Sequence, residues 1–316
     1  MAKQDRILIG IDGGGTKTHL VMASADGQIL GEERVGQSNI HTTSAASIKT
    51  QLRNGIERLF HGARIMTGRR VDVIVAGMAG IDHATDIEYA ETLVSQAVSG
   101  MTGPATQVHV VNDTIIGLYA GVPSGIGICV IGGTGSNCYG RSGKAKESWA
   151  GGLGHILADE GSGYDMGLRA LMAVVKAEDG RGPATKLSAL ILKRYGVKKV
   201  RDLVPIVYKP DYGKTQIAQI AIDVQEAAEA GDKVAREIAK GAGAELSALV
   251  LAVGKKLFAP TKPVDIVLIG GVLQHDPFVQ KEFKRLVRAK YKKANFIIPQ
   301  DPPVMGAIRM AQHMVS

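Results

Sequence analysis

The sequence GIDGGGTKT (Gly10–Thr18) carries the main signal for the fold, and IGGTGSN (Ile131–Asn137) repeats it far along the chain. Each glycine run follows an apolar run that is typical of a β-strand. Glycine has no Cβ, so consecutive backbone N–H groups can close on an anion, and a neighbouring threonine hydroxyl adds a donor. Two such loops in one chain predict a phosphate held between two lobes.

Asp12 stands at the end of the first apolar run, just before the glycines. A carboxylate there could hold the Mg²⁺ that accompanies a nucleoside triphosphate, directly or through a water molecule. We therefore expect Asp12 to act on a metal ion.

Hydrophobic periodicity predicts the same order of elements after each loop. In the first half it predicts strands at 6–12, 19–24 and just after the Asp26-Gly27 turn, a helix at 44–60, a strand at 71–76, a helix at 89–98 and a strand at 108–111. The second half begins again with strands at 127–131 and 137–139. A repeated β-β-β-α-β-α plan predicts an α/β fold with two similar lobes and a ligand in the cleft between them.

The remaining segments complete the second lobe and return to the first. They are predicted as helices at 164–176, 185–195, 215–230 and 233–256, then a strand at 264–269 that ends in two glycines. A short helix after Pro302 and Pro303 is expected to pack on the N-terminal lobe. The predicted domains are therefore 1–112, closed by the helix 303–316, and 113–302.

The composition is that of a soluble globular protein, with 316 residues, 45% hydrophobic and 22% charged. The low aromatic content, 4%, argues against a stacking surface for nucleic acid. The net charge is +8, and its basic residues gather at 281–293 beside apolar residues at helical spacing. We interpret this stretch as a solvated helix face, and we expect neither nucleic acid nor membrane as a partner.

The cysteines, Cys129 and Cys138, indicate neither a disulfide framework nor a zinc site. Reduced, intracellular thiols are expected. The first apolar stretch is too short, and too soon interrupted by Asp12, for a signal peptide. These features predict a cytoplasmic protein.

Five motifs follow one another in an order that resembles a known family: DGGGTKT, VVNDT around Asp113, GGTGSN, GGLGHILADEGSGY (Gly151–Tyr164) and IGGV (Ile269–Val272). Over essentially the whole chain they resemble the N-acetylglucosamine kinase group of the BadF/BadG ATPase family. The resemblance implies the actin, Hsp70 and hexokinase fold, in which two ribonuclease-H-like lobes close over ATP and Mg²⁺. It also implies transfer of the γ-phosphate to the 6-hydroxyl of an amino sugar, N-acetylglucosamine or glucosamine, by a homodimer.

The resemblance assigns the ATP contacts motif by motif. Gly14, Gly15, Thr16 and Lys17 would face the β- and γ-phosphates, and Asp12 would act on Mg²⁺. From the second lobe, the phosphates would be covered by Gly133, Thr134 and Gly135. The adenosine would lie against Gly270 and Gly271.

Asp113 follows a predicted strand and precedes an apolar helix. Taken alone, this position favours a helix N-cap, which is a common role for aspartate. The resemblance instead implies that Asp113 is the base that accepts the proton of the sugar hydroxyl, because phosphoryl transfer needs such a group.

The resemblance also implies a set of sugar contacts, and their chemistry suits hydroxyl groups. They are Asn39, Asp113, Ser136, Asn137, Gly152, Leu153, Gly154 and Asp159. Leu153 departs from the pattern, because an aromatic residue would be expected there in an animal N-acetylglucosamine kinase. The residues leave the sugar open among glucosamine, N-acetylglucosamine, N-acetylmuramic acid and glucose.

Two other classes share this ATPase core. The ATP-driven activator of a 2-hydroxyacyl-CoA dehydratase or benzoyl-CoA reductase carries an iron–sulfur cluster, for which each subunit supplies two suitably placed cysteines. Cys129 and Cys138 lie within neighbouring predicted strands, which favours the kinase. A chaperone or filament protein would need a substrate-binding extension that this length does not provide.

Overall fold

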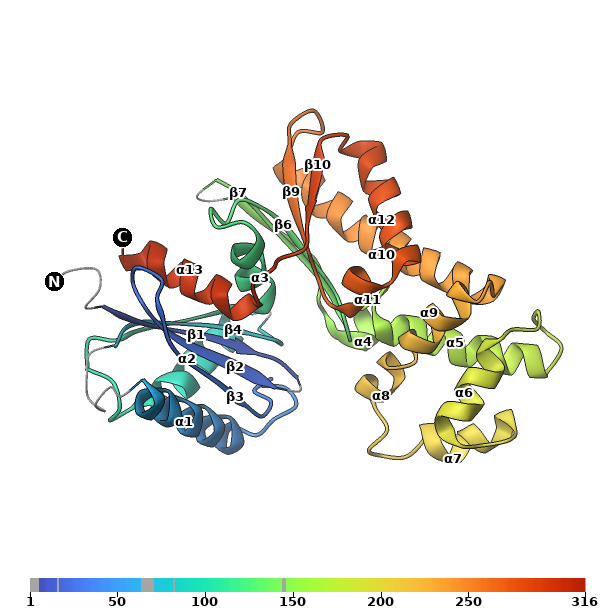
Figure 1. Ribbon diagram of the computed structural model, residues 1–316, viewed down its shortest axis with the longest axis horizontal. Helices are drawn as coiled ribbons and strands as arrows, with labels where there is room; N and C mark the ends of the chain where they lie inside the picture. The colour runs from blue at the N-terminus through green and yellow to red at the C-terminus, as the bar shows by residue number, and fades with distance from the viewer. Residues whose placement is uncertain (1–5, 16, 64–70, 82, 144–145, 316) are drawn as a thin grey trace. The chain divides into compact units, whose positions relative to one another are not determined.

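The computed structural model describes residues 6–15, 17–63, 71–81, 83–143 and 146–315 (Figure 1). The chain divides into two compact units. Unit 1 comprises Met1–Ile126 together with Pro299–Ser316, and unit 2 comprises Gly127–Ile298.

The sheet of unit 1 has the strand order β3-β2-β1-β4-β5. Its strands are β1 (Ile7–Gly13), β2 (Thr18–Ser24), β3 (Ile29–Val35), β4 (Val71–Met78) and β5 (Gln107–Asn112). The first three form an antiparallel meander, and β4 and β5 continue the sheet in parallel with β1. The turn after β1 therefore stands at the carboxyl edge of the parallel strands, where ligands commonly bind in such sheets.

Helices cover both faces of this sheet (Figure 1). α1 (Ala45–Gly62) and α2 (Ala84–Val98) pack on the face that carries Ile7, Ile9 and Ile11. α3 (Asp113–Gly121) and α13 (Pro303–Val315) pack on the face that carries Leu8. The alternation along β1 follows from the two-residue period of a strand, which sends successive side chains to opposite faces.

α3 belongs to unit 1, whereas the predicted boundary placed it at the start of the second lobe. Its contacts explain the difference. The Arg309 guanidinium of α13 donates to the Ala120 carbonyl at 2.5 Å, and Ile116 packs in the same apolar cluster as Val304 and Ile308. α3 and α13 thus cover one face of the sheet together.

The sheet of unit 2 repeats the topology of unit 1, with the order β10-β9-β6-β7-β8. Its strands are β6 (Gly127–Gly132), β7 (Ser136–Ser142), β8 (Lys146–Gly151), β9 (Val264–Ile269) and β10 (Ala294–Ile297). The meander β6-β7-β8 corresponds to β1-β2-β3, and β9 and β10 run parallel to β6. The α/β fold class with two similar lobes is therefore confirmed.

Most helices of unit 2 lie between β8 and β9. In chain order they are α4 (Gly154–Leu157), α5 (Gly163–Glu178), α6 (Leu187–Tyr195), the 3₁₀ turn η2 (Val200–Leu203), α7 (Val204–Val207), α8 (Lys214–Ala218), α9 (Ala221–Glu229) and α10 (Lys233–Leu257). After β9 come α11 (Gly271–His275) and α12 (Pro277–Lys290). The helix predicted at 215–230 is thus two helices, α8 and α9.

Candidate functional site

The glycine turn between β1 and β2 is held by its own backbone. The Gly14 N–H donates to the Lys17 carbonyl at 3.0 Å, and the Ser38 N–H donates to the Gly14 carbonyl at 3.2 Å. A Cβ on Gly15 would meet no atom within 4 Å, so the tip of the turn is open, and Lys17 is exposed beside it. Thr16, which was predicted to contact phosphate, lies outside the described residues.

Two carboxylates meet at the carboxyl edge of the unit 1 sheet. Asp12 is the penultimate residue of β1, in register with Gly77 of β4, and Asp113 directly follows β5. The pKa of Asp12 is raised to about 7, chiefly by burial and further by repulsion from Asp113, while the charge of Lys17 acts in the opposite direction. A cation placed against this carboxylate pair would relieve their repulsion.

The helix-capping role belongs to Asn112 and not to Asp113. The Asn112 side chain accepts a hydrogen bond from the Thr114 N–H at 3.0 Å, and its amide donates to the Ile81 carbonyl at 2.9 Å. Asp113 is the first residue of α3 itself. The N-cap interpretation that the sequence alone favoured is therefore wrong for Asp113.

Asn39 lies at the same edge. Its Oδ1 accepts from the His41 N–H at 2.9 Å. Gly80 has φ +84°, and a Cβ there would come within 3.1 Å of that same oxygen. The Ala79 N–H donates to the Gly13 carbonyl at 2.8 Å, which joins this loop to the end of β1. Unit 1 thus brings together the predicted Asn39 and the Asp12–Asp113 pair.

The start of α5 donates backbone hydrogen bonds to the glycine loop of unit 2. The Gly163 N–H donates to the Gly133 carbonyl at 2.7 Å, and the Tyr164 N–H donates to the Thr134 carbonyl at 3.3 Å. Gly270 has φ +92°, and a Cβ there would lie 2.5 Å from the Gly132 carbonyl oxygen. Only glycine fits this approach, so the two predicted ATP motifs of unit 2 touch through their backbones.

Asp159 connects the same loop to α8. It is 3% exposed, and it is the non-glycine residue with positive φ, +71°, in the described part of the chain. Its Oδ1 accepts from the Ser136 N–H at 2.8 Å, and its Oδ2 pairs with the Lys214 Nζ at 2.6 Å. Asp159 is therefore engaged by protein groups where the sequence predicted a sugar contact.

Lys214 is a candidate that the sequence did not reveal. A Cβ on Gly135 would lie 2.8 Å from its Nζ, so its ammonium group stands directly over the glycine loop. No local motif marks this lysine, because it reaches the loop only through the fold. Its charge balances Asp159 at a position where the phosphates of a nucleotide are expected.

The remaining predicted sugar contacts gather beside β7. Asn137 is in register with Gly151 of β8. Gly152 has φ +80°, its N–H donates to the Ser136 carbonyl at 3.1 Å, and its Cβ would come within 2.7 Å of the Asn137 Oδ1. Leu153, which precedes α4, is 55% exposed. Gly154 faces open space.

A pocket of about 410 Å³ lies within unit 2 beside the glycine loop. Its lining includes Gly133 and Thr134 of the loop, Gly271 after β9, and His275 and Asp276 at the end of α11. Residues of α5, α8 and α9 complete it. The predicted phosphate loop and one of the two glycines predicted to face adenosine, Gly271, therefore share one pocket.

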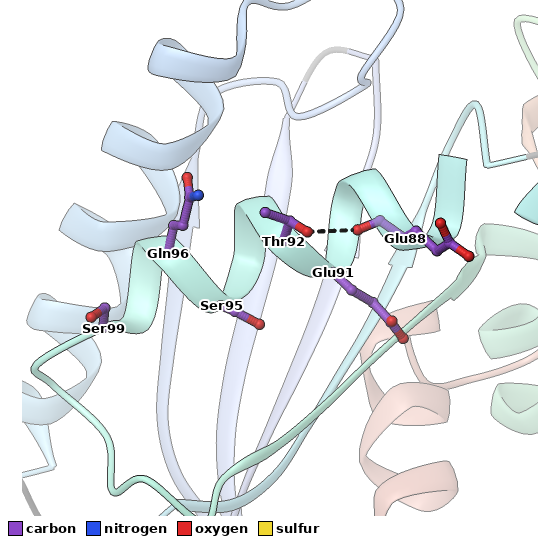
Figure 2. Close-up of a pocket in the computed structure, with 6 residues that line it drawn as sticks. All are labelled: Glu88, Glu91, Thr92, Ser95, Gln96 and Ser99. Carbon is purple, nitrogen blue, oxygen red and sulfur yellow. Dashed lines mark hydrogen bonds between the residues drawn. The ribbon is translucent and has the colours of Figure 1, made fainter. Parts of the chain in front are cut away.

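A second hollow runs along the exposed side of α2 (Figure 2). None of the predicted site residues lines it. Its lining consists of Glu88, Glu91, Thr92, Ser95, Gln96 and Ser99. Within the described residues, no helix is both long and apolar enough to cross a membrane. In the same residues, no group of three or more His, Cys, Asp or Glu side chains forms a ready metal cage.

Comparisons with known proteins cover nearly the whole chain. An N-acetylmuramic acid/N-acetylglucosamine kinase of Clostridium acetobutylicum is 34% identical over 97% of this chain and 98% of its own. An N-acetyl-D-glucosamine kinase of Dictyostelium discoideum is 30% identical over 96% and 97%. Among solved structures, a putative N-acetylglucosamine kinase of Chromobacterium violaceum has a TM-score of 0.74 at 23% identity, covering 96% of this chain and 98% of its own.

The family model of the BadF/BadG/BcrA/BcrD ATPases matches residues 9–311, a span that includes both glycine loops, Asp113 and Gly270. That span and the identity to the Clostridium kinase leave one conclusion. This chain belongs to the BadF/BadG/BcrA/BcrD ATPase family.

Proposed function

We propose that this protein is an ATP-dependent kinase that transfers the γ-phosphate to the 6-hydroxyl of an amino sugar, with N-acetylglucosamine and glucosamine as the first candidates. The relatives named above are kinases of such sugars. The observation that carries the proposal is the Asp12–Asp113 pair, since Asn112 caps α3 and Asp113 is not needed for that role.

Each carboxylate has a separate role in the proposed reaction. Asp113 accepts the proton of the sugar hydroxyl as that oxygen bonds to the γ-phosphorus, and the bond to the bridging oxygen breaks to release ADP. Asp12 would hold Mg²⁺, which neutralises charge on the phosphates. The donor set fits this ion, because Mg²⁺ usually takes one or two carboxylates and completes its shell with phosphates and water.

The other predicted residues bind and orient the substrates. Lys17 and the N–H groups of the two glycine loops would contact the phosphates, since such loops present backbone donors to anions. Asn39, Ser136 and Asn137 would contact sugar hydroxyls. A cytoplasmic location and a homodimer belong to the same proposal, to be tested by cell fractionation and analytical ultracentrifugation.

The alternative, an activator with an iron–sulfur cluster, is less well supported. Cys129 and Cys138 are both 0% exposed on paired strands, and burial raises the pKa of the Cys138 thiol. Cluster ligands are thiolates. A buried thiol held in its neutral form is a poor candidate for a cluster between two subunits.

A coupled assay of ADP release tests the proposal. Mg·ATP is offered with glucosamine, N-acetylglucosamine, N-acetylmuramic acid, N-acetylmannosamine and glucose, and the product is identified by NMR. Turnover that depends on one amino sugar, with phosphate on its 6-hydroxyl, is the expected result. ATP hydrolysis without phosphorylation of any sugar would contradict the proposal and favour the activator.

A further inference from the structure

Asp276 holds a buried oxygen that the fold leaves without a hydrogen-bond donor. The side chain is 3% exposed. Its Oδ1 caps α12 by accepting from the Phe278 N–H at 2.8 Å and the Val279 N–H at 3.0 Å. Its Oδ2 has no hydrogen-bond partner among the described residues. The cap therefore accounts for only one of its two oxygens.

This oxygen belongs to a residue of the 410 Å³ pocket beside the glycine loop. Leaving a buried carboxylate oxygen unpaired is costly, and a donor from a bound ligand would remove that cost. Burial raises the pKa of Asp276 despite the Val279 and Phe278 N–H groups, which lower it, and the charge of Glu229 adds to the rise. Another polar residue of the lining, Gln225, already donates to Glu229 at 2.9 Å and to the His275 carbonyl at 3.3 Å.

We propose that Asp276 selects the nucleobase, its Oδ2 accepting a hydrogen bond from the exocyclic amino group of adenine. The inference rests on the proposed function, because it takes the pocket as the place of the base of ATP. Adenine presents an amino donor at its 6-position, whereas guanine and hypoxanthine present a carbonyl acceptor there. A carboxylate oxygen would attract the first and repel the other two, so the site would prefer adenine nucleotides.

The substitution Asp276→Asn tests this sharply, because it retains the N-cap of α12 and replaces the acceptor oxygen Oδ2 by a hydrogen-bond donor. Asparagine is as good an N-cap as aspartate. Its single oxygen should stay on the Phe278 and Val279 N–H groups, since turning its NH₂ toward two donors is unfavourable. The NH₂ then replaces Oδ2, and an acceptor becomes a donor.

The measurement is isothermal titration of ADP and IDP into the protein with Mg²⁺ and without sugar. The wild-type protein should bind ADP about tenfold or more tightly than IDP. In Asp276→Asn the preference for ADP, taken as the dissociation constant of IDP divided by that of ADP, should fall by a factor of about 10 to 100. Asp276→Ser, which caps the helix but lacks the second oxygen, should bring the ratio close to one.

A matched control is available in the same unit. Asp232 is also a buried N-cap, of α10, and its Oδ1 accepts from the Ala235 N–H at 2.8 Å. Asp232→Asn should lower the melting temperature, because the Lys186 N–H loses its acceptor Oδ2, 2.7 Å away. It should not change the ratio, because Asp232 does not line the pocket. Melting curves of all variants show whether each is folded.

The outcomes separate this inference from the kinase proposal. An inverted ratio in a protein that phosphorylates no sugar would support the role of Asp276 and contradict the kinase. Equal binding of ADP and IDP by the wild-type protein, or an unchanged ratio in folded Asp276→Asn, would overturn the role of Asp276 even in an active kinase. Failure of the wild-type protein to bind either nucleotide would overturn it as well.

Discussion

Gly241 and Gly243 lie two positions apart in α10, and substitution by alanine should change the stability of the protein in opposite directions at the two sites. A Cβ on Gly241 would meet only the Arg169 Nη1, at 3.9 Å. A Cβ on Gly243 would lie 2.6 Å from the Val279 carbonyl oxygen and 3.1 Å from both the Glu282 Cβ and the Phe283 N. These last atoms belong to α12, so α10 and α12 pack with their backbones close together at Gly243.

Both substitutions by alanine gain helix propensity, about 0.8–1.0 kcal/mol. At Gly243 the methyl also forces α12 away by roughly 0.8 Å to restore ordinary van der Waals contact at about 3.4 Å. Overpacking of this kind costs about 1–3 kcal/mol, and the upper part of this range applies because the backbone cannot turn aside. Gly241→Ala should therefore stabilise the protein by up to about 1 kcal/mol. The free energy of unfolding of Gly243→Ala should be about 2–3 kcal/mol lower than that of Gly241→Ala.

Urea unfolding followed by tryptophan fluorescence measures the difference, because the single tryptophan, Trp149, lies in β8 of unit 2. With a denaturant slope of about 2 kcal/mol per molar urea, the two midpoints should differ by about 1–1.5 M. Since α12 begins beside Asp276, Gly243→Ala should also weaken ADP binding. Coincident midpoints for the two variants would refute the packing argument.

Three further predictions concern two single side chains and one ion pair. Asp113→Asn should lower turnover by a factor of about 10² to 10⁴ while ADP still binds, and near-normal turnover in the coupled assay would exclude it as the base. Asp159→Asn and Lys214→Met should show a coupling energy above about 1 kcal/mol in a double-mutant cycle of urea unfolding, because Asp159 is buried; additivity would contradict this. Burial raises the pKa of Asp232, but hydrogen bonds from Ala235 and Lys186 outweigh it and lower the pKa below 3.8. Its stabilisation is therefore present above pH 3.8 and lost as the pH falls through the lower folded value, so Asp232→Ala should cost about 1–2 kcal/mol at pH 7, and melting curves should show that gap closing in acid; a constant gap would argue against it.

Much of the fold was predictable because its signals are local. The strand at Val264–Ile269 is observed with the predicted bounds, and α10 ends one residue beyond its prediction. The break between α8 and α9 was not predictable, because it depends on a distant helix. There α5 presents Gly163 and Gly167 to the carbonyls of Ala218 and Ile217, and no pattern within 215–230 announces that contact.

The candidate site likewise has features that the local sequence predicts and features that only the tertiary structure reveals. Glycine loops and strand-end carboxylates can be read from sequence, because neighbouring residues create them. Asn112 and Asp113 are adjacent and both favour caps, so only the hydrogen bond to the Thr114 N–H decides between them. Lys214 and Asp276 were missed because each reaches the loop or the pocket by tertiary packing.

The two sheets share one topology, but the chain takes a different course in each unit after the third strand of the meander. In unit 1 it passes through α1 and returns as β4, whereas in unit 2 it passes through α4 to α10 before it returns as β9. The long insertion supplies both Lys214 and the α8–α9 wall of the pocket beside the glycine loop. Among the described residues, the connection after the third strand is thus one helix in unit 1 and a run of helices in unit 2, while the strand order is the same in both. Directed evolution of nucleotide preference should accordingly concentrate its libraries in that insertion and at α11, and leave the sheet cores unchanged.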